Sequence, residues 1–572
     1  MVKREISKIF REIALMLEIK GDNPFKIRAY ENGARALEVL DGDIDGYIVD
    51  GKIEGIKGIG EALSEKILEL HETGMLKFYE DLKSSIPTGL FELIKIPGIG
   101  PKKARVLNEN LSIETIGELE YACLENRLVE LPNFGEKSQS NILKGIQVLK
   151  KARGKFLYGD VIEIAEGIIE KLLESELVER CEIAGSLRRK KEIVKDIDIV
   201  ASSEKPKDLM DYLVSLPVIE DVIEKGSTKT SVILNNGINM DIRVVRDREF
   251  PYALHHFTGS KEHNTALRHR AKSLGIKINE YGLFHNEKLL LCKDEKDIYK
   301  ELGLEYIPPE LRENSGEIEV AIDHSLPELI EYKDLQGMLH IHTKYSDGSN
   351  TIEELVEKAK LMGFSYIGIA DHSKSAFYAR GLEVERVLKQ AKEIDELNSK
   401  LKNFRILKGI ESDILSDGSL DYDDDILSQF DYVIASVHSN LRMEKDKMTK
   451  RIIRAIENKY TTIIGHLSNR LLLAREESEM DLEAVLNAAA KHNKIIEINA
   501  DPRRLDIDWR YIKHAKRKGI KFAINPDAHS LHGMENIKFG IGIARKGWLG
   551  ADDIINSMGI EEVMELFDYM HK

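Results

Sequence analysis

Three aspartates combine residue type and spacing in a way that indicates metal-dependent chemistry. Asp196 and Asp198 lie two residues apart in the apolar run DIDIV, and Asp241 belongs to a second such run, NMDIRVV. If both runs are strands, residues i and i+2 share one face of the sheet, where neighbouring carboxylates repel unless a cation holds them together. Three converging carboxylates are what two divalent ions need in phosphoryl transfer. For the pair Asp196 and Asp198 alone, solvated carboxylates on an exposed strand are the simpler interpretation.

The sequence GSLRR, residues 185–189, precedes the first aspartate and favours the metal interpretation. Gly185 supplies a turn and Ser186 a hydroxyl. Arg188 and Arg189 supply guanidinium groups, which bind phosphate oxygens through paired hydrogen bonds. The combination predicts a triphosphate beside the carboxylates.

A second set of candidate ligands follows seven short apolar runs in the C-terminal half. Six of the seven runs end in a metal-competent residue, and the candidates are His340, His342, Asp347, His372, Glu411, His438, His466, Asp527 and His529. A β/α barrel builds its site from residues at the C-terminal ends of successive parallel strands. One histidine alone is more simply a core or surface residue, but six of the chain's 17 histidines share this position. Imidazole-rich sites favour Zn²⁺, Mn²⁺ or Fe²⁺ over Mg²⁺, and this many ligands predicts a multinuclear cluster.

A glycine turn that opens a helix occurs three times near the N-terminus, at residues 56–60, 96–100 and 131–135. Such a turn directs backbone N–H groups and the positive end of a helix toward an anion, and glycine lets the backbone approach closely. One copy is more simply a tight turn between packed helices, whereas three copies favour phosphate binding. Lys102 and Lys103 follow the second turn and suit phosphate contacts.

The elements that must position these residues change along the chain. Residues 1–150 have apolar residues at helical spacing, so an all-α region is expected. Strand-like and helical runs alternate over 156–300, which indicates an α/β region. From residue 336 onward, apolar runs of four to six residues alternate with amphipathic helices, which predicts a parallel sheet or barrel.

Composition excludes several classes of protein. Hydrophobic residues make up 42% and charged residues 32% of 572 residues, which excludes a disordered chain and predicts about four domains. No apolar run is long enough to cross a membrane, and charges interrupt the N-terminal apolar stretch where a signal peptide would need none. Three scattered cysteines favour a reducing cytoplasm. The net charge of −15 means that nucleic-acid contacts must be local or mediated by metals.

The first half resembles the family X DNA polymerases, the DNA polymerase beta-like nucleotidyltransferases, over about residues 1–310. GSLRR, DID, MDIR and HHFTGSKEHN (255–264) match the family's motifs in order. The resemblance implies that the three aspartates bind two Mg²⁺ or Mn²⁺ ions. It also implies a nucleotide site made of Gly185, Ser186, Arg189, His256, Phe257, Gly259, Lys261 and Asn264. His256 replaces the family's tyrosine beside the sugar, and Lys261 stands where an acidic residue is common.

The N-terminal residues resemble the small lyase domain of DNA polymerase beta. Lys66 matches the catalytic Schiff-base lysine, and Lys26 and Tyr30 match residues around a 5′-phosphate. Ala62 stands where the family has a second basic residue, so weak lyase activity is expected. A solvated helix lysine is the alternative. The implied DNA-binding residues are Lys26, Tyr30, Gly58, Gly60, Gly98, Gly100, Lys102 and Lys103.

The C-terminal motifs H-x-H-T, D-G-S, A-D-H, G-x-E, S-V-H, G-H and N-x-D-x-H resemble the polymerase and histidinol phosphatase (PHP) family over about 336–572. The resemblance implies three ions, Mn²⁺ or Zn²⁺. The first would be held by His340, His342, Glu411 and Asp527, the second by Glu411, His438 and His466, and the third by Asp347, His372 and His529. Arg380, Arg503 and Arg504 are candidates for phosphate contacts.

The expected fold is therefore multidomain: an all-α region whose three glycine turns resemble helix-hairpin-helix motifs, an α/β palm and thumb, and a distorted TIM-like barrel. The expected domains are a lyase-like 5′-phosphate-binding domain over 1–85, a helix-hairpin-helix fingers region over 86–155, a nucleotidyltransferase palm over 156–250, a nucleotide-pocket thumb over 251–310, a linker over 311–335 and a PHP barrel over 336–572.

The expected function is gap filling in DNA repair by a monomeric cytoplasmic polymerase, acting on dNTPs and on gapped or primed DNA with a 5′-phosphate. The PHP domain would act as a 3′→5′ exonuclease or a 3′-phosphatase, and an abasic-site endonuclease role is open. A small-molecule phosphatase fused to a DNA-binding module is an alternative that the nucleotide-pocket motifs disfavour. A DNA-end scaffold without activity is disfavoured by the complete ligand sets.

Overall fold

The computed structural model describes residues 3–40, 44–111, 113–114, 116, 119, 122–123, 128, 131, 134–152, 154–376, 379–473 and 476–571. The chain forms two compact units, Met1–Arg153 and Gly154–Lys572. Within the described ranges no helix has the length and apolar character needed to cross a membrane.

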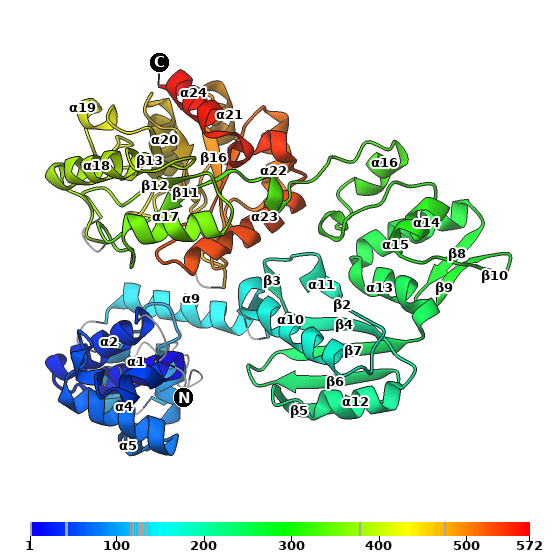
Figure 1. Cartoon of the computed structure of the whole chain (residues 1–572), viewed down its shortest axis with the longest axis horizontal. Coiled ribbons are helices and arrows are strands. Elements are labelled where there is room, and N and C mark those ends of the chain that lie inside the picture. Colours follow the sequence, from blue (N-terminus) through cyan, green and yellow to red (C-terminus); the bar gives the residue numbers. More distant parts are fainter. Residues whose placement is uncertain are drawn as a thin grey trace. The chain divides into compact units, whose positions relative to one another are not determined.

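The first unit is helical in its described part, as predicted (Figure 1). Its α-helices are α1 (Lys3–Lys20), α2 (Pro24–Glu38), α3 (Ile44–Val49), α4 (Glu61–Thr73), α5 (Lys77–Ser84), α6 (Thr88–Leu93), α7 (Pro101–Leu111) and α9 (Glu136–Ala152). Apolar residues at helical spacing, such as Phe10, Leu37 and Ile67, are completely buried in one core.

The second unit begins with a five-stranded sheet in the order β2-β4-β7-β6-β5. Its strands are β2 (Arg180–Ile183), β4 (Asp196–Ser202), β5 (Ile219–Lys225), β6 (Lys229–Leu234) and β7 (Asn239–Val245). β4 and β7 are parallel, and the other neighbours are antiparallel. Helices α10 (Tyr158–Glu174) and α12 (Pro206–Val214) share a core with Ile197 and Met240 of this sheet. The buried face therefore fixes which residues of β4 and β7 point away from the core.

A smaller α/β layer follows the sheet. It contains α13 (Phe250–Thr258), α14 (Lys261–Ser273), the antiparallel strands β8 (Ile276–Asn279), β9 (Gly282–His285) and β10 (Lys288–Leu290), and α15 (Glu295–Glu301). The stretch 311–335, expected as a linker, carries helix α16 (Glu317–Ile322) and packs into the core of this layer through Leu311 and Ile318.

The C-terminal part is the predicted barrel, with seven parallel strands in sequence order. They are β11 (Gly337–Ile341), β12 (Tyr366–Ile369), β13 (Arg405–Asp413), β14 (Tyr432–Ser436), β15 (Ile463–Ile464), β16 (Ile495–Asn499) and β17 (Phe522–Asn525). Its main helices are α17 (Ile352–Leu361), α18 (Val384–Asn398), α20 (Lys445–Glu457), α21 (Leu482–Lys491), α22 (Trp509–Arg517), α23 (Ile537–Lys546) and α24 (Ile560–Met570). A parallel bridge between Ile341 and Ala528 brings the last strand back to the first and nearly closes the barrel.

One end of the barrel is filled by apolar side chains. Tyr366, Tyr432 and Ile495, each the first residue of its strand, pack in one cluster with Phe567 of α24. The opposite end, at the C-termini of the strands, carries the predicted ligands. This division matches barrels in which one end stabilises the fold and the other carries the site.

Candidate active sites

The three predicted aspartates converge on one face of the first sheet. The parallel register between β4 and β7 pairs Asp198 directly with Asp241, and Asp196 lies two residues earlier on the same strand. Burial, and then the charges of Asp196 and Asp241, raise the pKa of Asp198 to about 7. Burial and the Asp241 charge also raise the pKa of Asp196. Carboxylates crowded in this way fit a site for divalent cations, which relieve the repulsion.

Two neighbours complete this carboxylate site. Lys229 of β6 places its Nζ 2.9 Å from Oδ2 of Asp241, a contact that the sequence did not predict. Gly185 has a φ of +61°, and a Cβ at this position would collide with the Asp198 carboxylate. Glycine is therefore required here for two independent reasons, its backbone conformation and its lack of a side chain.

The two arginines of GSLRR contact protein groups. Residues Gly185–Arg188 form the short helix α11. Arg188 bonds through Nη2 to Glu295 Oε2 at 2.7 Å, and Arg189 donates from Nη1 to the carbonyl of Thr258 at 2.6 Å and from Nε to Glu313 at 3.2 Å. The arginines thus connect the sheet to the motif HFTGS, and phosphate binding by Arg189 and Ser186 stays a prediction.

The nucleotide-pocket motif surrounds a cavity next to β7. His256 and Phe257 line this cavity of ≈ 440 Å³ together with Arg243, which lies two residues after Asp241. The guanidinium of Arg243 lies 5.2 Å from the centroid of the Phe257 ring. Arg243 joins the site because β-strand alternation puts it on the face that Asp241 occupies.

Three other residues that were expected to contact the nucleotide lie elsewhere in this part of the fold. Asn264 is buried and donates from Nδ2 to the carbonyl of His256 at 2.7 Å, so it supports the turn. A Cβ on Gly259 would collide with the Asn264 side chain, which explains a glycine there. Lys261 begins α14 and is exposed. Contacts of these residues with a nucleotide stay predictions.

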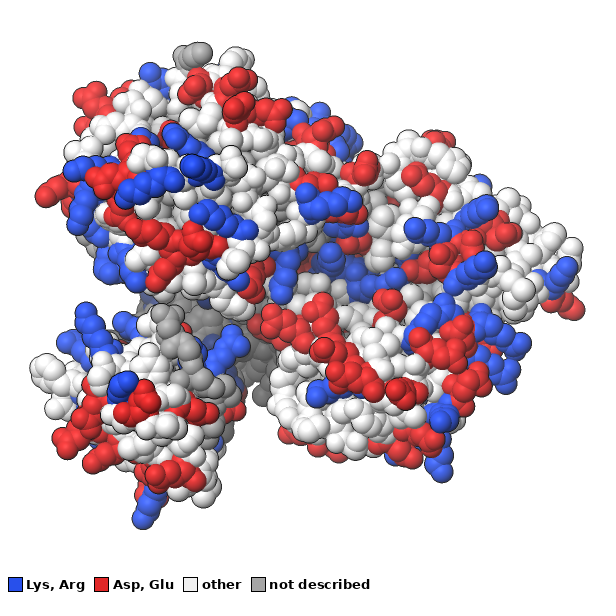
Figure 2. Space-filling model, viewed as in Figure 1, with Lys and Arg blue, Asp and Glu red and all other residues white. Residues whose placement is uncertain are grey.

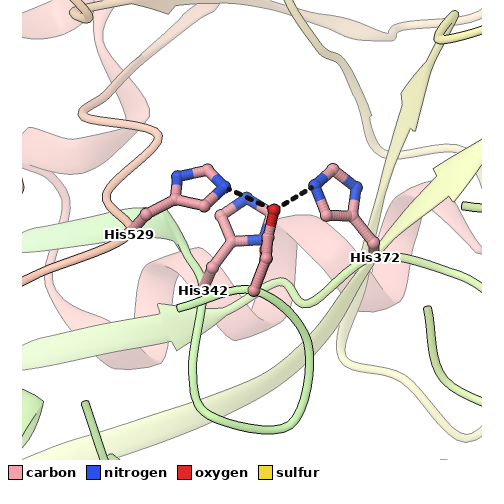
Figure 3. Close-up of side chains that lie close together, drawn as sticks. His342, His372 and His529 are labelled. Atoms are coloured by element: carbon pink, nitrogen blue, oxygen red, sulfur yellow. Dashed lines mark ion pairs between the residues drawn. The ribbon is translucent and has the colours of Figure 1, made fainter. Parts of the chain in front are cut away.

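The predicted histidines gather at the C-terminal end of the barrel. Figure 3 shows the rings of His342, His372 and His529 turned toward one another around one carboxylate. Oδ2 of Asp347 lies 3.3 Å from Nε2 of His529 and 3.6 Å from Nε2 of His372. Among the described residues, three groups have ligand atoms within 4.8 Å of one another: His342, Asp347, His372 and His529; His340, His342 and Asp527; and His372, Glu411 and His438.

Glu411 is the carboxylate that connects the groups. Its Oε2 lies 2.9 Å from His372 Nδ1, and its Oε1 lies 3.2 Å from His438 Nε2 and 3.0 Å from His466 Nε2. All nine predicted ligands are therefore brought together. Their division among three ions stays a prediction, because His372 joins the group in which His466 was expected.

The donor set fits metal ions. In the described part of the chain, Nε2 of His340 and both ring nitrogens of His342 are buried and make no hydrogen bond. Carboxylate oxygens lie 3.2 Å from Nε2 of His342 and 3.4 Å from Nε2 of His340. Two atoms that bind one tetrahedral ion at roughly 2.1 Å lie about 3.4 Å apart. The spacing is thus that of ligands arranged around a cation.

Sequence reasoning missed the carboxylates that orient these rings. Glu497 of β16 is completely buried, lies 2.5 Å from His340 Nδ1 and accepts a hydrogen bond from the backbone of His466 at 2.8 Å. Asp413 contacts Nδ1 of His438 in the same manner. Such partners fix the tautomer and orientation of a metal-binding imidazole. The available signal was an acidic residue inside the apolar run KIIEIN.

Around Phe78, the first unit brings together the residues expected at a 5′-phosphate. The ammonium groups of Lys26 and Lys66 lie 5.2 and 5.4 Å from the centroid of the Phe78 ring. The Tyr30 ring stacks on Phe78 with centroids 6.2 Å apart. Two cations beside one aromatic surface suit an anionic end of DNA. Phe78 was not predicted.

The repeated glycine turns share one backbone geometry. The amides of Ile59, Ile99 and Phe134 donate to the carbonyls three residues earlier, at 2.9, 3.0 and 3.0 Å. Gly58 and Gly98 have φ values of +102° and +92°. Gly60 and Gly100 follow them directly before α4 and α7. Residues 132–133 of the third copy lie outside the described residues.

The lysines after the second turn differ in their surroundings. Lys102 is exposed, and Lys103 donates to the carbonyl of Gly98 at 3.2 Å. On the face shown in Figure 2, Lys and Arg are interspersed with Asp and Glu rather than forming one continuous basic surface. DNA contacts on this face would therefore be local, as expected from the net charge of −15.

Comparison with known proteins defines the class. Family models match the helix-hairpin-helix domain at residues 1–76, the SAM-like helix-hairpin-helix tandem at 90–147, the DNA polymerase beta thumb at 253–313 and the PHP domain at 338–501. These matches, the sheet with its aspartates and the barrel with its histidines define a DNA polymerase beta-like nucleotidyltransferase joined to a PHP domain.

The relatives narrow this class to one family. The DNA polymerase/3′-5′ exonuclease PolX of Bacillus subtilis (strain 168) is 38% identical over 567 residues, which cover 98% of this chain and 99% of that protein. The chain belongs to the family X DNA polymerases that carry a fused PHP domain. A probable phosphatase of Thermoanaerobacter sp. (strain X514) is 31% identical over 229 residues, 38% of this chain and 89% of that protein. The crystal structure of Leishmania infantum polymerase beta in a ternary P/T complex is 23% identical, with a TM-score of 0.27, and covers 40% of this chain and all of that one.

Proposed function

We propose that the protein is a DNA polymerase that fills short gaps and trims 3′ ends at its PHP site. The observation that carries the polymerase assignment is the register that sets Asp198 beside Asp241, with Asp196 on the same face. The 38% identity to a DNA polymerase/3′-5′ exonuclease over nearly the whole chain supports both activities.

In the polymerase site the residues have separable roles. Asp196, Asp198 and Asp241 would hold two Mg²⁺ or Mn²⁺ ions. Such ions make a hydroxyl more acidic and stabilise charge on the leaving group. Gly185 leaves room for the Asp198 carboxylate, and His256 and Phe257 would border the sugar of the incoming dNTP. Burial is the main cause that lowers the pKa of His256, and the charges of Arg268 and Arg243 lower it further against the opposing charge of Glu280.

In the PHP site the nine ligands would hold Mn²⁺ or Zn²⁺ ions. The resemblance to the PHP family implies three such ions. Such ions polarise the phosphoryl group and lower the pKa of an attacking water. Glu497 and Asp413 hold His340 and His438 in position. The products to be tested are a nucleoside monophosphate from a 3′ end, inorganic phosphate from a 3′-phosphate, and an incised abasic site.

The proposed partners are gapped or primed DNA with a 5′-phosphate, and dNTPs. The DNA backbone would be bound by the turns at 56–60 and 96–100 and by Lys102. The 5′ end of the DNA would be bound by the surface at Phe78. A monomer in the cytoplasm is proposed, and the three scattered cysteines, too few for a disulfide framework, favour this reducing compartment.

A gapped duplex with a labelled primer and a 5′-phosphate tests the proposal. With dNTPs and Mg²⁺ or Mn²⁺, the protein is expected to extend the primer to the end of the gap. Without dNTPs it is expected to shorten the 3′ end. Asp198→Ala should abolish only extension, by orders of magnitude, while DNA binding persists. Extension by Asp198→Ala at the parental rate would contradict the assignment.

A further inference from the structure

The candidate PHP site opens into a cavity with a wall outside the barrel. This cavity of ≈ 560 Å³ is bordered by the ligands Asp527 and His529 and by Arg503 and Arg504 of the barrel. Its opposite side is formed by Lys155 and by Phe156 and Leu157, which constitute the short strand β1. The part of the chain that carries the polymerase carboxylates therefore contributes to the surroundings of the PHP ligands.

Three cationic side chains border this cavity. Nη1 of Arg504 is buried and makes no hydrogen bond with the described residues, and its Nε lies 3.9 Å from Asp527 Oδ2. Arg503 pairs with Asp501 at 2.6 Å but keeps 73% of its side chain exposed. Lys155 is partly exposed. A buried guanidinium nitrogen without an acceptor indicates that an anion binds here.

The position of Lys155 is fixed from the polymerase side. β1 pairs antiparallel with β3 (Ile193–Val194), with Phe156 opposite Val194. The amide of Tyr158 donates to the carbonyl of Glu192 at 3.0 Å, and the Tyr158 ring contacts Phe539 of the barrel edge-on at 5.8 Å. A strand held in this way presents Lys155 to the cavity of the barrel without belonging to the barrel.

A second cavity connects the two sites further. It has a volume of ≈ 500 Å³ and is bordered by Ser186, Lys195 and Asp196 of the polymerase part and by Arg470 and Leu472 of the barrel. Leu472 also borders the first cavity. The candidate polymerase and PHP sites thus open into neighbouring cavities that share one wall residue.

We propose that Lys155 binds a backbone phosphate of the DNA strand whose 3′ end lies in the PHP site. The nuclease substrate site is then built jointly, with Arg504 at the scissile phosphate and Lys155 at a phosphate further along the strand. Phe156 and Leu472 offer an apolar surface for the unpaired sugars and bases. This inference rests on the proposed nuclease function.

The test uses the full-length protein with Lys155→Ala, Lys155→Arg and the control Lys171→Ala, whose lysine is exposed on α10 and borders neither cavity. The substrate is a single-stranded oligonucleotide without dNTPs. Lys155→Ala is expected to raise KM for exonucleolytic degradation about tenfold with little change in kcat, because one charged hydrogen bond is lost. The slope of log KM against log salt should fall by roughly 0.7, the value for one phosphate contact on a single strand. Lys155→Arg should restore the parental KM and the parental salt slope. Lys171→Ala should match the parent in both quantities.

Three results would overturn the inference. Degradation by Lys155→Ala with the parental KM and salt slope would show that Lys155 is not at the strand. An increase in KM for dNTP during gap filling, without a change in degradation, would place Lys155 at the triphosphate instead. If the parent protein itself does not degrade the oligonucleotide, the proposed nuclease function is wrong. The inference about Lys155, which rests on that function, is then wrong as well.

Discussion

The ammonium group of Lys229 lies 2.9 Å from the carboxylate of Asp241. A cation of the protein therefore neutralises one of the three carboxylates that are candidates for metal binding. Lys229 lies on β6, the strand that pairs antiparallel with β7, and Ser231 of β6 is the residue directly opposite Asp241. The lysine and a metal ion would compete for the same oxygen atoms.

Lys229→Met is expected to lower the Mg²⁺ concentration that gives half-maximal gap extension. The side chains of this ion pair are about one-third exposed, so the interaction is worth at most about 1 kcal/mol and the shift should be no more than about fivefold. A Mg²⁺ titration of primer extension measures it. Lys225→Met, which removes an exposed pair with Asp211, is the control. A higher Mg²⁺ requirement would mean that Lys229 helps to form the site.

Asp198→Asn should stabilise the metal-free protein at pH 8. The pKa of Asp198 is about 7 in the fold, raised mainly by burial, against roughly 3.9 in an unfolded chain. Between these values the folded state binds the extra proton, so this carboxylate makes the parent less stable as the pH rises from 4 to 7. The uncharged side-chain amide of the variant removes this pH dependence. The free energy of unfolding at pH 8 should therefore rise by at most about 4 kcal/mol. Thermal unfolding in EDTA at pH 4.5 and pH 8 measures it, and an equal difference at both pH values would refute the assignment.

His342→Ala should abolish 3′ trimming and leave nucleotide addition largely intact. His342 belongs to two of the three ligand groups, so its replacement removes one ligand from each of these two groups. The expected decrease in trimming is at least about a hundredfold. His514→Ala, a surface change on α22 of the same barrel, is the matched control. An equal loss of extension would indicate a shared site or a damaged fold.

Glu497→Gln should weaken metal binding at the PHP site by about ten- to a hundredfold. The carboxylate favours a proton on Nδ1 of His340 and so leaves Nε2 for a metal. An amide can adopt the same shape without the charge. Metal content after dialysis, and trimming as a function of Mn²⁺, measure the change. Excess Mn²⁺ should restore activity, and a variant with parental metal content would contradict this role.

Lys66 should give little covalent trapping by borohydride on an incised abasic duplex. The amine lies beside Phe78 and donates to the carbonyl of Ala62 at 3.2 Å, with no second basic residue at position 62. Binding should instead distinguish a gap with a 5′-phosphate from one without. Lys26→Ala should reduce that preference several-fold. Strong trapping that is lost in Lys66→Ala would show that lyase activity has been underestimated.

The sequence was sufficient for features that depend on local periodicity. Alternation along DIDIV placed Asp196 and Asp198 on one face, and the ligands of the barrel lie at or just after the C-terminal ends of their strands. Lys229 and Glu497 could not be predicted in the same way. The first depends on the contact between neighbouring strands, and the second on which strand of a closing barrel faces His340. Arg189 shows the same limit, because its partner Glu313 is 124 residues away along the chain.

The pairing of β1 with β3 restricts how this chain can be recombined with its relatives. Only Lys195 separates β3 from Asp196, and Lys155 directly precedes β1. A one-residue insertion in β1 ahead of Phe156 would turn Phe156 to the opposite face of the pair. A chimaera that takes its barrel from a relative, joined at residue 336, would place β1 against barrel residues with which it does not pack in this chain. A graft that keeps both cavities intact must therefore take β1 and β3 together with the barrel that carries Leu472.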